Sequence, residues 1–228
     1  MNIIDTLAGK LIVSCQALPD EPMHGAHTMA QMADAAERGG AGGIIANGAL
    51  DITAIRRQVS LPVIGVVNRH YPDSEVVLTP TQDDIHSLMS ARPDFISIEV
   101  TDRRRPGAEE LATVLPAIRR RYPELLLLAA VSTVLEAEWA QSLGFDGITT
   151  ALYGHTPQTR HHQLSDNDYG VLRAICRAVN LPVFAEGGIL TPAQAAKTLA
   201  CGAFAVVVGG AITRPQSITE RFVAALPV

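Results

Sequence analysis

A glutamate followed by two glycines is the stretch of this sequence that most clearly suggests chemistry. Glu186 comes directly after the apolar run 182–185, which is too short for a helix and typical of a strand buried on both faces. A carboxylate between such a strand and Gly187-Gly188 is expected to lose part of its water, which raises the pKa of a carboxyl group toward that of an acid–base catalyst. The alternative is a carboxylate that only caps nearby backbone. The pattern therefore makes Glu186 a candidate catalytic residue.

A second glycine pair follows the next apolar run in the same way. Gly209-Gly210 comes directly after 205–208, as Gly187-Gly188 follows the strand before it. Backbone N–H groups left bare by glycines and backed by helix N-termini suit a phosphate, and in (β/α)8 barrels that site follows strands seven and eight. The alternative is that these glycines only form tight turns. We predict phosphate binding by Gly187, Gly188, Gly209 and Gly210.

Strand and helix patterns alternate along the whole chain. Eight units in 228 residues give a step of about 28 residues, which is normal for a strand and its following helix. Strict alternation with buried-type strands predicts a parallel sheet, and eight units favour closure into a barrel. We therefore predict an α/β fold, a (β/α)8 TIM barrel, as a single domain over residues 1–228. The expected strands are 11–16, 42–46, 62–67, 95–100, 125–131, 147–150, 182–185 and 205–208. The expected helices are 26–38, 52–58, 81–91, 109–121, 133–143, 168–179, 193–200 and 213–226.

Composition and charge argue against several classes of function. A net charge of −5 argues against a nucleic-acid surface, and no apolar run approaches the ~20 residues that span a bilayer. The N-terminus has no signal-peptide pattern, and three unpaired cysteines are typical of a reducing compartment, so we expect a cytoplasmic protein. The seven histidines lack ligand spacing, so no metal is predicted. The expected ligand is a small molecule, and the expected assembly is a homodimer.

Polar residues at the other strand ends complete the candidate set, because barrel active sites lie at the carboxyl ends of the strands. Gln16 and Asn47 could bind sugar hydroxyls or only brace a loop. Glu99 could be a second carboxylate or the structural partner of Arg69. The remaining strand-end candidates are Asn68, Thr101, Ser132, Tyr153 and His155.

Several motifs together resemble one enzyme family over nearly the whole chain. They include Ser14-Cys15-Gln16, Ala46-Asn47-Gly48, Ala185-Glu186-Gly187 and the run GGAITRP at 209–215. The chain resembles bacterial N-acetylmannosamine-6-phosphate 2-epimerases, the isomerases of sialic acid catabolism. The resemblance implies interconversion of N-acetylmannosamine 6-phosphate and N-acetylglucosamine 6-phosphate by moving a proton at C2, with no redox cofactor. It also implies that Glu186 is the catalytic glutamate.

Other positions depart from the pattern that the resemblance implies. Asn68 stands where the family has the lysine that handles the C2 proton, and a carboxamide does not titrate near neutrality. Two arginine positions are Ile45 and Gly188. Two aspartate positions are Glu99 and either Ala130 or Val131, and a serine position is Tyr153. Three functions therefore stay open: an amino-sugar phosphate epimerase that uses Glu186 with another partner, a different reaction on a phosphorylated sugar, and a non-catalytic sugar-phosphate binding protein.

Overall fold

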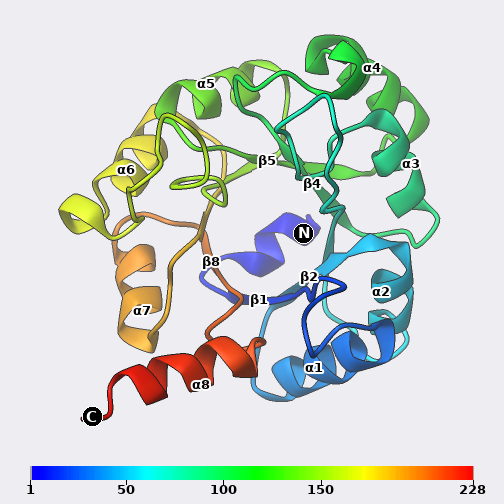
Figure 1. The fold of residues 1–228 in the computed structure, drawn as a ribbon. Helices are drawn as coiled ribbons and strands as arrows, with labels where there is room; N and C mark the ends of the chain where they lie inside the picture. Colours follow the sequence, from blue (N-terminus) through cyan, green and yellow to red (C-terminus); the bar gives the residue numbers. More distant parts are fainter. Residues whose placement is uncertain (1, 228) are drawn as a thin grey trace.

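Eight parallel strands close into one barrel in this computed structural model, which describes residues 2–227 (Figure 1). Each strand pairs with its neighbours in sequence, and β1 pairs with β8 to complete the ring. This confirms the predicted TIM-barrel fold. The strands are β1 Leu11–Cys15, β2 Gly43–Asn47, β3 Val63–Val66, β4 Phe95–Glu99, β5 Leu126–Ala130, β6 Gly147–Thr149, β7 Val183–Glu186 and β8 Ala205–Val208.

Helices follow the strands and surround the barrel (Figure 1). Three of them, α3, α5 and α7, begin with a capping box. The hydroxyl of the threonine before the helix accepts the backbone N–H of the third helical residue, and the side chain of that residue accepts the backbone N–H of the threonine. Such caps fix where each helix begins relative to the strand before it. The helices are α1 Ala26–Arg38, α2 Gly48–Ile55, α3 Gln82–Met89, α4 Leu111–Arg121, α5 Val134–Ser142, α6 Asp166–Ala178, α7 Pro192–Ala200 and α8 Pro215–Ala224.

The barrel interior and the layer under the helices are two separate apolar clusters. Alternate strand residues point inward, so Ile64, Phe95 and Leu128 fill the interior, whereas Val63, Ile96 and Leu127 pack against helices. The same alternation turns some strand-end residues into the mouth, such as Glu186 of β7, and others outward, such as Val208 of β8. It therefore decides which strand-end side chains can meet a substrate.

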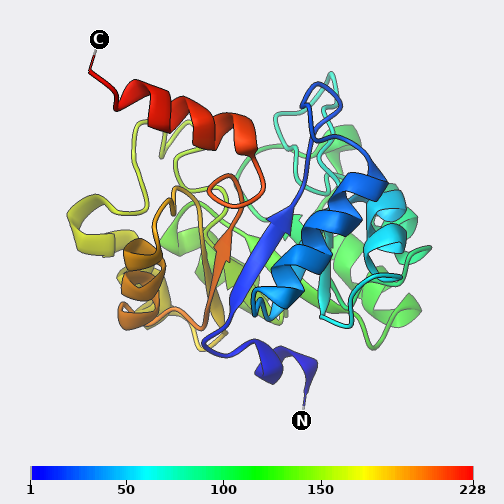
Figure 2. The same ribbon diagram turned by 90° about the horizontal axis from the view of Figure 1, so that it is seen from below.

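The N-terminal end of the barrel is closed by a short 3₁₀ helix, η1 Ile3–Leu7, which the sequence reading did not predict. Ile4 and Leu7 are buried and join the interior cluster beneath the strands. Figure 2 shows η1 at the end of the barrel opposite α8. Among the described residues, the barrel interior is therefore filled at this end and opens at the opposite mouth.

Helix α8 stands away from the barrel instead of packing on it. None of its residues is buried, and Phe222 is 73% exposed. Figures 1 and 2 show α8 projecting outward beyond α7. Beside α7, a groove of about 390 Å³ is lined by outward residues of β1 and β8, including Leu11, Val206 and Val208, and exposes Leu190 and Ile212 at its rim. The last predicted helix therefore exists, but it does not cover the strands that it follows.

Outside α2, every predicted boundary agrees with the structure to within two residues, whereas the two ends of α2 differ by four and three. It was expected to begin at residue 52 but begins at Gly48, directly after β2. Gly48 has a φ of 81°, a conformation that favours glycine and lets the chain turn from strand to helix without a loop. No helix among residues 2–227 is long and apolar enough to cross a bilayer.

Candidate active site

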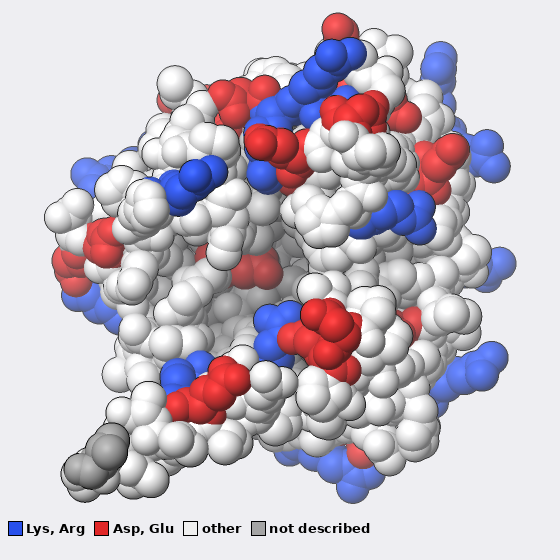
Figure 3. All heavy atoms as spheres, viewed as in Figure 1, with Lys and Arg blue, Asp and Glu red and all other residues white. Residues whose placement is uncertain are grey.

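A cavity of about 330 Å³ opens at the carboxyl ends of the strands. Its size lies within the range of small-molecule sites. Figure 3 shows the molecule hollowed in the middle of this face, with acidic atoms in the depth of the hollow. Several predicted site residues line it together: Gln16, Asn68, Glu186, Gly187, Gly188, Gly209 and Gly210.

Glu186 is the last residue of β7 and is held from two sides. Its carboxylate accepts a hydrogen bond of 2.6 Å from the Thr149 hydroxyl, and its backbone N–H and C=O both bond to the Thr150 side chain. Burial raises the pKa of the Glu186 carboxyl, and the bond from Thr149 partly opposes that shift. A fixed carboxyl group with a raised pKa on the wall of a cavity is suited to take up and release a proton.

This raised pKa predicts a pH-dependent stability difference between the wild type and Glu186→Gln. Since the folded-state pKa lies above the unfolded value, folding favours the protonated form, and stability is lost as pH rises from the ordinary carboxyl range through the folded pKa. Glutamine is neutral throughout. We expect the melting temperature of the variant, relative to wild type, to increase with pH between about 4 and 8. Thermal unfolding across that range measures it, with Glu138→Gln on the exposed face of α5 as control. A difference that stays constant with pH would contradict the prediction.

A chain of side-chain amides crosses the mouth from β1 to β3. The Asn68 amide donates to the Gln16 carbonyl oxygen at 2.7 Å, and the Gln16 amide donates to the Ser14 hydroxyl at 2.8 Å. Asn47 lies behind them and accepts the backbone N–H of Asn68 at 2.9 Å. Asn68 therefore orients groups that can bond sugar oxygens or an amide, but none of these side chains can serve as a base.

The two glycine turns lie side by side on the β7–β8 edge of the cavity. Gly187 and Gly188 have φ values of 112° and 65°, which side chains rarely adopt. Among the described residues, the N–H groups of Gly187, Gly188, Gly209 and Gly210 donate no hydrogen bond. These N–H groups are therefore available to an anionic ligand.

Arg214 adds a positive charge beside these turns. It is not among the site residues predicted from the sequence. It lines the cavity, and its guanidinium bonds the Glu21 carboxylate at 2.6 Å. Nearby, the Thr213 hydroxyl donates to the backbone oxygens of Ser14 and Gly209, which ties this turn to β1. The sequence signal for Arg214 was its place in the run GGAITRP, four residues after the second glycine pair.

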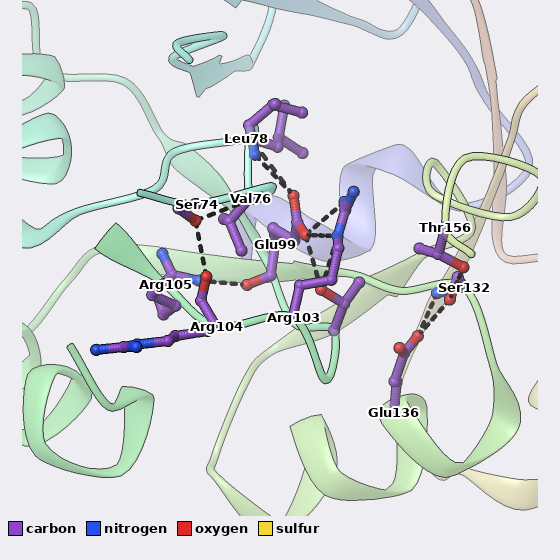
Figure 4. A network of polar contacts seen from close by, with 12 residues as sticks. Ser74, Val76, Leu78, Glu99, Arg103, Arg104, Arg105, Ser132, Glu136 and Thr156 are labelled. Atoms are coloured by element: carbon purple, nitrogen blue, oxygen red, sulfur yellow. Dashed lines mark hydrogen bonds and ion pairs between the residues drawn. The ribbon is translucent and has the colours of Figure 1, made fainter. Parts of the chain in front are cut away.

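Glu99 lies outside the cavity in a network of its own. It is fully buried, and its carboxylate accepts from Thr101 at 2.7 Å, from Arg103 at 2.6 and 2.8 Å, and from the backbone N–H groups of Val77 and Leu78 (Figure 4). Glu99 thus fastens the loop after β3 to the end of β4. Of its two predicted roles, a structural ion pair fits, although its partner is Arg103 and not Arg69.

Arg69 and Tyr153 also lie outside the cavity lining. Arg69 forms an ion pair of 2.7 Å with Asp84 at the start of α3, so its charge is engaged there. Tyr153 stacks on the His162 ring with centroids 6.1 Å apart. The structure thus places three of the five predicted substrate-binding residues in structural contacts, and leaves Gln16 in the cavity with Asn47 behind it.

Comparison with known proteins assigns the chain to a family. The family described as "Putative N-acetylmannosamine-6-phosphate epimerase" matches residues 29–227. A relative from Enterobacter sp. (strain 638), named as a putative N-acetylmannosamine-6-phosphate 2-epimerase, is 53% identical over 225 residues, covering 99% of this chain and 96% of the relative. This chain belongs to the N-acetylmannosamine-6-phosphate 2-epimerase family. The family is one of carbohydrate epimerases, which are isomerases.

Solved structures agree with the assignment. The N-acetylmannosamine-6-phosphate 2-epimerase from Clostridium perfringens superposes with a TM-score of 0.94 at 41% identity, over 99% of this chain and 97% of that one. The (S)-3-O-geranylgeranylglyceryl phosphate synthase from Thermoplasma acidophilum has a TM-score of 0.61 at 18% identity, with coverages of 96% and 95%. That second likeness concerns the fold alone.

The structure also shows where the residues lie that differ from those expected for this epimerase family. Ile45 and Gly188 line the cavity, so two positions that the resemblance gives to arginines are uncharged there. Leu128 belongs to the interior cluster and Val131 to the outer one, so Ala130 is the inward-facing member of the pair left open by the sequence. Within residues 2–227, no group of three or more His, Cys, Asp or Glu side chains is arranged to hold a metal ion.

Proposed function

We propose that this protein interconverts N-acetylmannosamine 6-phosphate and N-acetylglucosamine 6-phosphate by proton transfer at C2. The observation that carries the proposal is Glu186, a carboxylate with a raised pKa on the wall of a cavity of sugar-phosphate size. The names of its relatives supply the substrate pair. A proton on a carbon next to a carbonyl can be removed by a carboxylate fixed against it.

The lining supports one orientation of the sugar phosphate. The phosphate would accept from the N–H groups of the two glycine turns, with Arg214 beside them. Gln16 and Asn68 would then lie across the cavity, where their amides can bond the acetamido group and hydroxyls. C2 would lie between these two subsites, within reach of Glu186.

Turnover of the free substrate in D₂O tests the proposal. The wild type, incubated with either epimer, is expected to form the other epimer and to place deuterium at C2, both of which proton NMR detects. Binding of both sugar phosphates without deuterium incorporation would favour the non-catalytic binding protein. Incorporation with formation of a product other than the two epimers would favour a different reaction.

We also propose that the protein is a homodimer in which α8 of each copy covers the apolar groove of the other. The groove is lined by Leu11, Val206 and Val208, the strand positions that a following helix covers in a closed barrel. Helix α8 exposes Phe222 and Val223, and none of the residues 215–224 that form it is buried against the rest of the described chain. The groove exposes Leu190 and Ile212 as well, so apolar surface on both the groove and α8 is covered when two copies exchange their last helices.

The dimer predicts a mass of twice 24.2 kDa in light scattering of the wild type. Phe222→Glu introduces a charge at the apolar face of α8, so it is expected to yield monomers at concentrations where wild type is dimeric. Gln216→Glu, an exposed polar position on the same helix, is the matched control and is expected to stay dimeric. A monomeric wild type would contradict the exchange.

We place this activity in the cytoplasm and in sialic acid catabolism. The three cysteines are unpaired, and Cys15 and Cys201 are buried, which is typical of proteins in a reducing compartment. Fractionation of the source cells, with activity recovered in the soluble cytoplasmic fraction, tests the location.

A further inference from the structure

Three ionisable side chains line the cavity: Glu186, His155 and Arg214. An arginine stays protonated in proteins, so Arg214 cannot exchange a proton with substrate. An imidazole both accepts and releases protons near neutrality and is the commonest general acid–base group in enzymes. His155 is therefore the cavity group besides Glu186 that can carry a proton.

The other titratable residues near the mouth have different positions. Glu99 is fully buried against Arg103, and Tyr153 stacks on His162. His70 is exposed on the loop after β3 and does not border the cavity. The position that the resemblance assigns to a lysine is Asn68, whose amide is engaged with Gln16.

The loop that carries His155 is anchored on both sides of it. The Gly154 N–H donates to the Thr159 hydroxyl at 2.9 Å, and the Thr156 hydroxyl donates to the Ser132 hydroxyl at 3.1 Å. Ser132 in turn donates to the buried carboxylate of Glu136, as Figure 4 shows. These bonds among buried side chains fasten the loop to the end of β5 and the start of α5. The backbone at His155 is thus held at the mouth although its side chain is exposed.

Glu186 and His155 border the cavity at different depths. Glu186 belongs to strand β7 itself and lies among the barrel ends, whereas His155 comes six residues after the end of β6. A sugar bound between the glycine turns and the amide chain would lie between them. One group faces it from the wall of the barrel and the other from the loop above.

We propose that His155 is the second catalytic residue of this epimerase and acts on the face of C2 opposite Glu186. The proposal rests on the proposed function. In one direction, the Glu186 carboxylate takes the C2 proton of the open-chain aldehyde, and the electron pair moves onto the C1 oxygen. The His155 imidazolium then gives its proton to the other face of C2, and the C1 carbonyl re-forms. In the reverse direction the two groups exchange roles, and both return to their starting protonation by exchange with water at the open mouth.

Half-reactions in D₂O test this pairing, because each group removes a proton from only one epimer. We expect His155→Gln to lose net epimerisation by about 10²–10⁴-fold while one epimer, offered alone, still exchanges its C2 proton with solvent. Glu186→Gln is expected to exchange the other epimer only. Free imidazole is expected to restore part of the turnover of His155→Ala. His70→Gln is the matched control and should behave as wild type.

The outcomes separate the pairing from the function on which it rests. Wild-type epimerisation by His155→Gln would overturn the pairing alone. Loss of exchange for both epimers in a folded His155→Gln that still binds both sugar phosphates would also overturn it, since one group would then not act alone on either face. A wild type that exchanges neither epimer would remove the proposed reaction and the pairing together.

Discussion

Glu186→Gln is expected to lower kcat by about 10²–10⁴-fold while the affinity for either sugar phosphate stays close to wild type. Glutamine has the same shape as glutamate, and its carbonyl oxygen can still accept the bond from Thr149. It cannot take up a proton, so the loss falls on the chemical step and not on binding. Steady-state kinetics in both directions and calorimetric titration of each epimer measure the two effects.

Two further variants make this result specific. Glu138→Gln removes a carboxylate from the exposed face of α5 and should keep wild-type kcat. Glu186→Asp keeps the acid but shortens it by one methylene, so it should retain more activity than the amide if proton transfer is what is lost. Equal kcat for Glu186→Gln and wild type would refute the role of this carboxylate.

Gly209→Val is expected to weaken sugar-phosphate binding by roughly 10–100-fold, the value of one or two hydrogen bonds to a charged group. A Cβ at this position would lie 3.3 Å from the Ser14 Cβ, which is tighter than an ordinary contact. The larger side chain would also enter the space in front of the backbone N–H groups of the turn. Titration of N-acetylglucosamine 6-phosphate and of inorganic phosphate measures the change.

Ala200→Val, at the exposed end of α7, adds branched bulk away from the cavity and serves as the matched control. Gly209→Ala should give a smaller loss than valine, because only the single close contact to Ser14 has to adjust. Unchanged phosphate affinity in a Gly209→Val protein with normal thermal unfolding would exclude this turn from the anion site.

The fold and the positions of the two glycine turns could be predicted from the sequence because each depends on local signals. Apolar runs of four to seven residues alternate with helical patterns in the order in which the barrel uses them, and two of these runs are followed by glycine pairs. Successive strand residues point alternately inward and outward, so one known inward residue gives the direction of the others. Leu128 points inward in β5, and therefore Ala130 does as well, whereas Val131 points outward. Register across neighbouring strands then brings Gln16, Asn68 and Glu186 to one cavity.

The contacts of charged side chains could not be predicted in this way. Arg69 pairs with Asp84 and Glu99 with Arg103, and both choices depend on how the loops after β3 and β4 fold back over the barrel. His155 was a candidate because of its place after the sixth strand, but the hydroxyl contacts from β5 that hold its loop at the mouth could not be predicted. The sequence pattern predicted that α8 is a helix. It did not indicate which surface this helix packs against, and in the structure none of its residues is buried.

The position of the 3₁₀ helix η1 determines which end of the chain is better suited to carry a tag or a fusion partner. It directs the start of the described chain out of the closed end of the barrel, whereas α8 leaves from the mouth side (Figure 2). A tag, fusion partner or sensor surface joined before η1 is separated from the cavity by the whole length of the barrel. The same attachment after α8 would lie beside the cavity mouth and the exposed helix. Immobilisation for binding measurements should therefore use the N-terminal side.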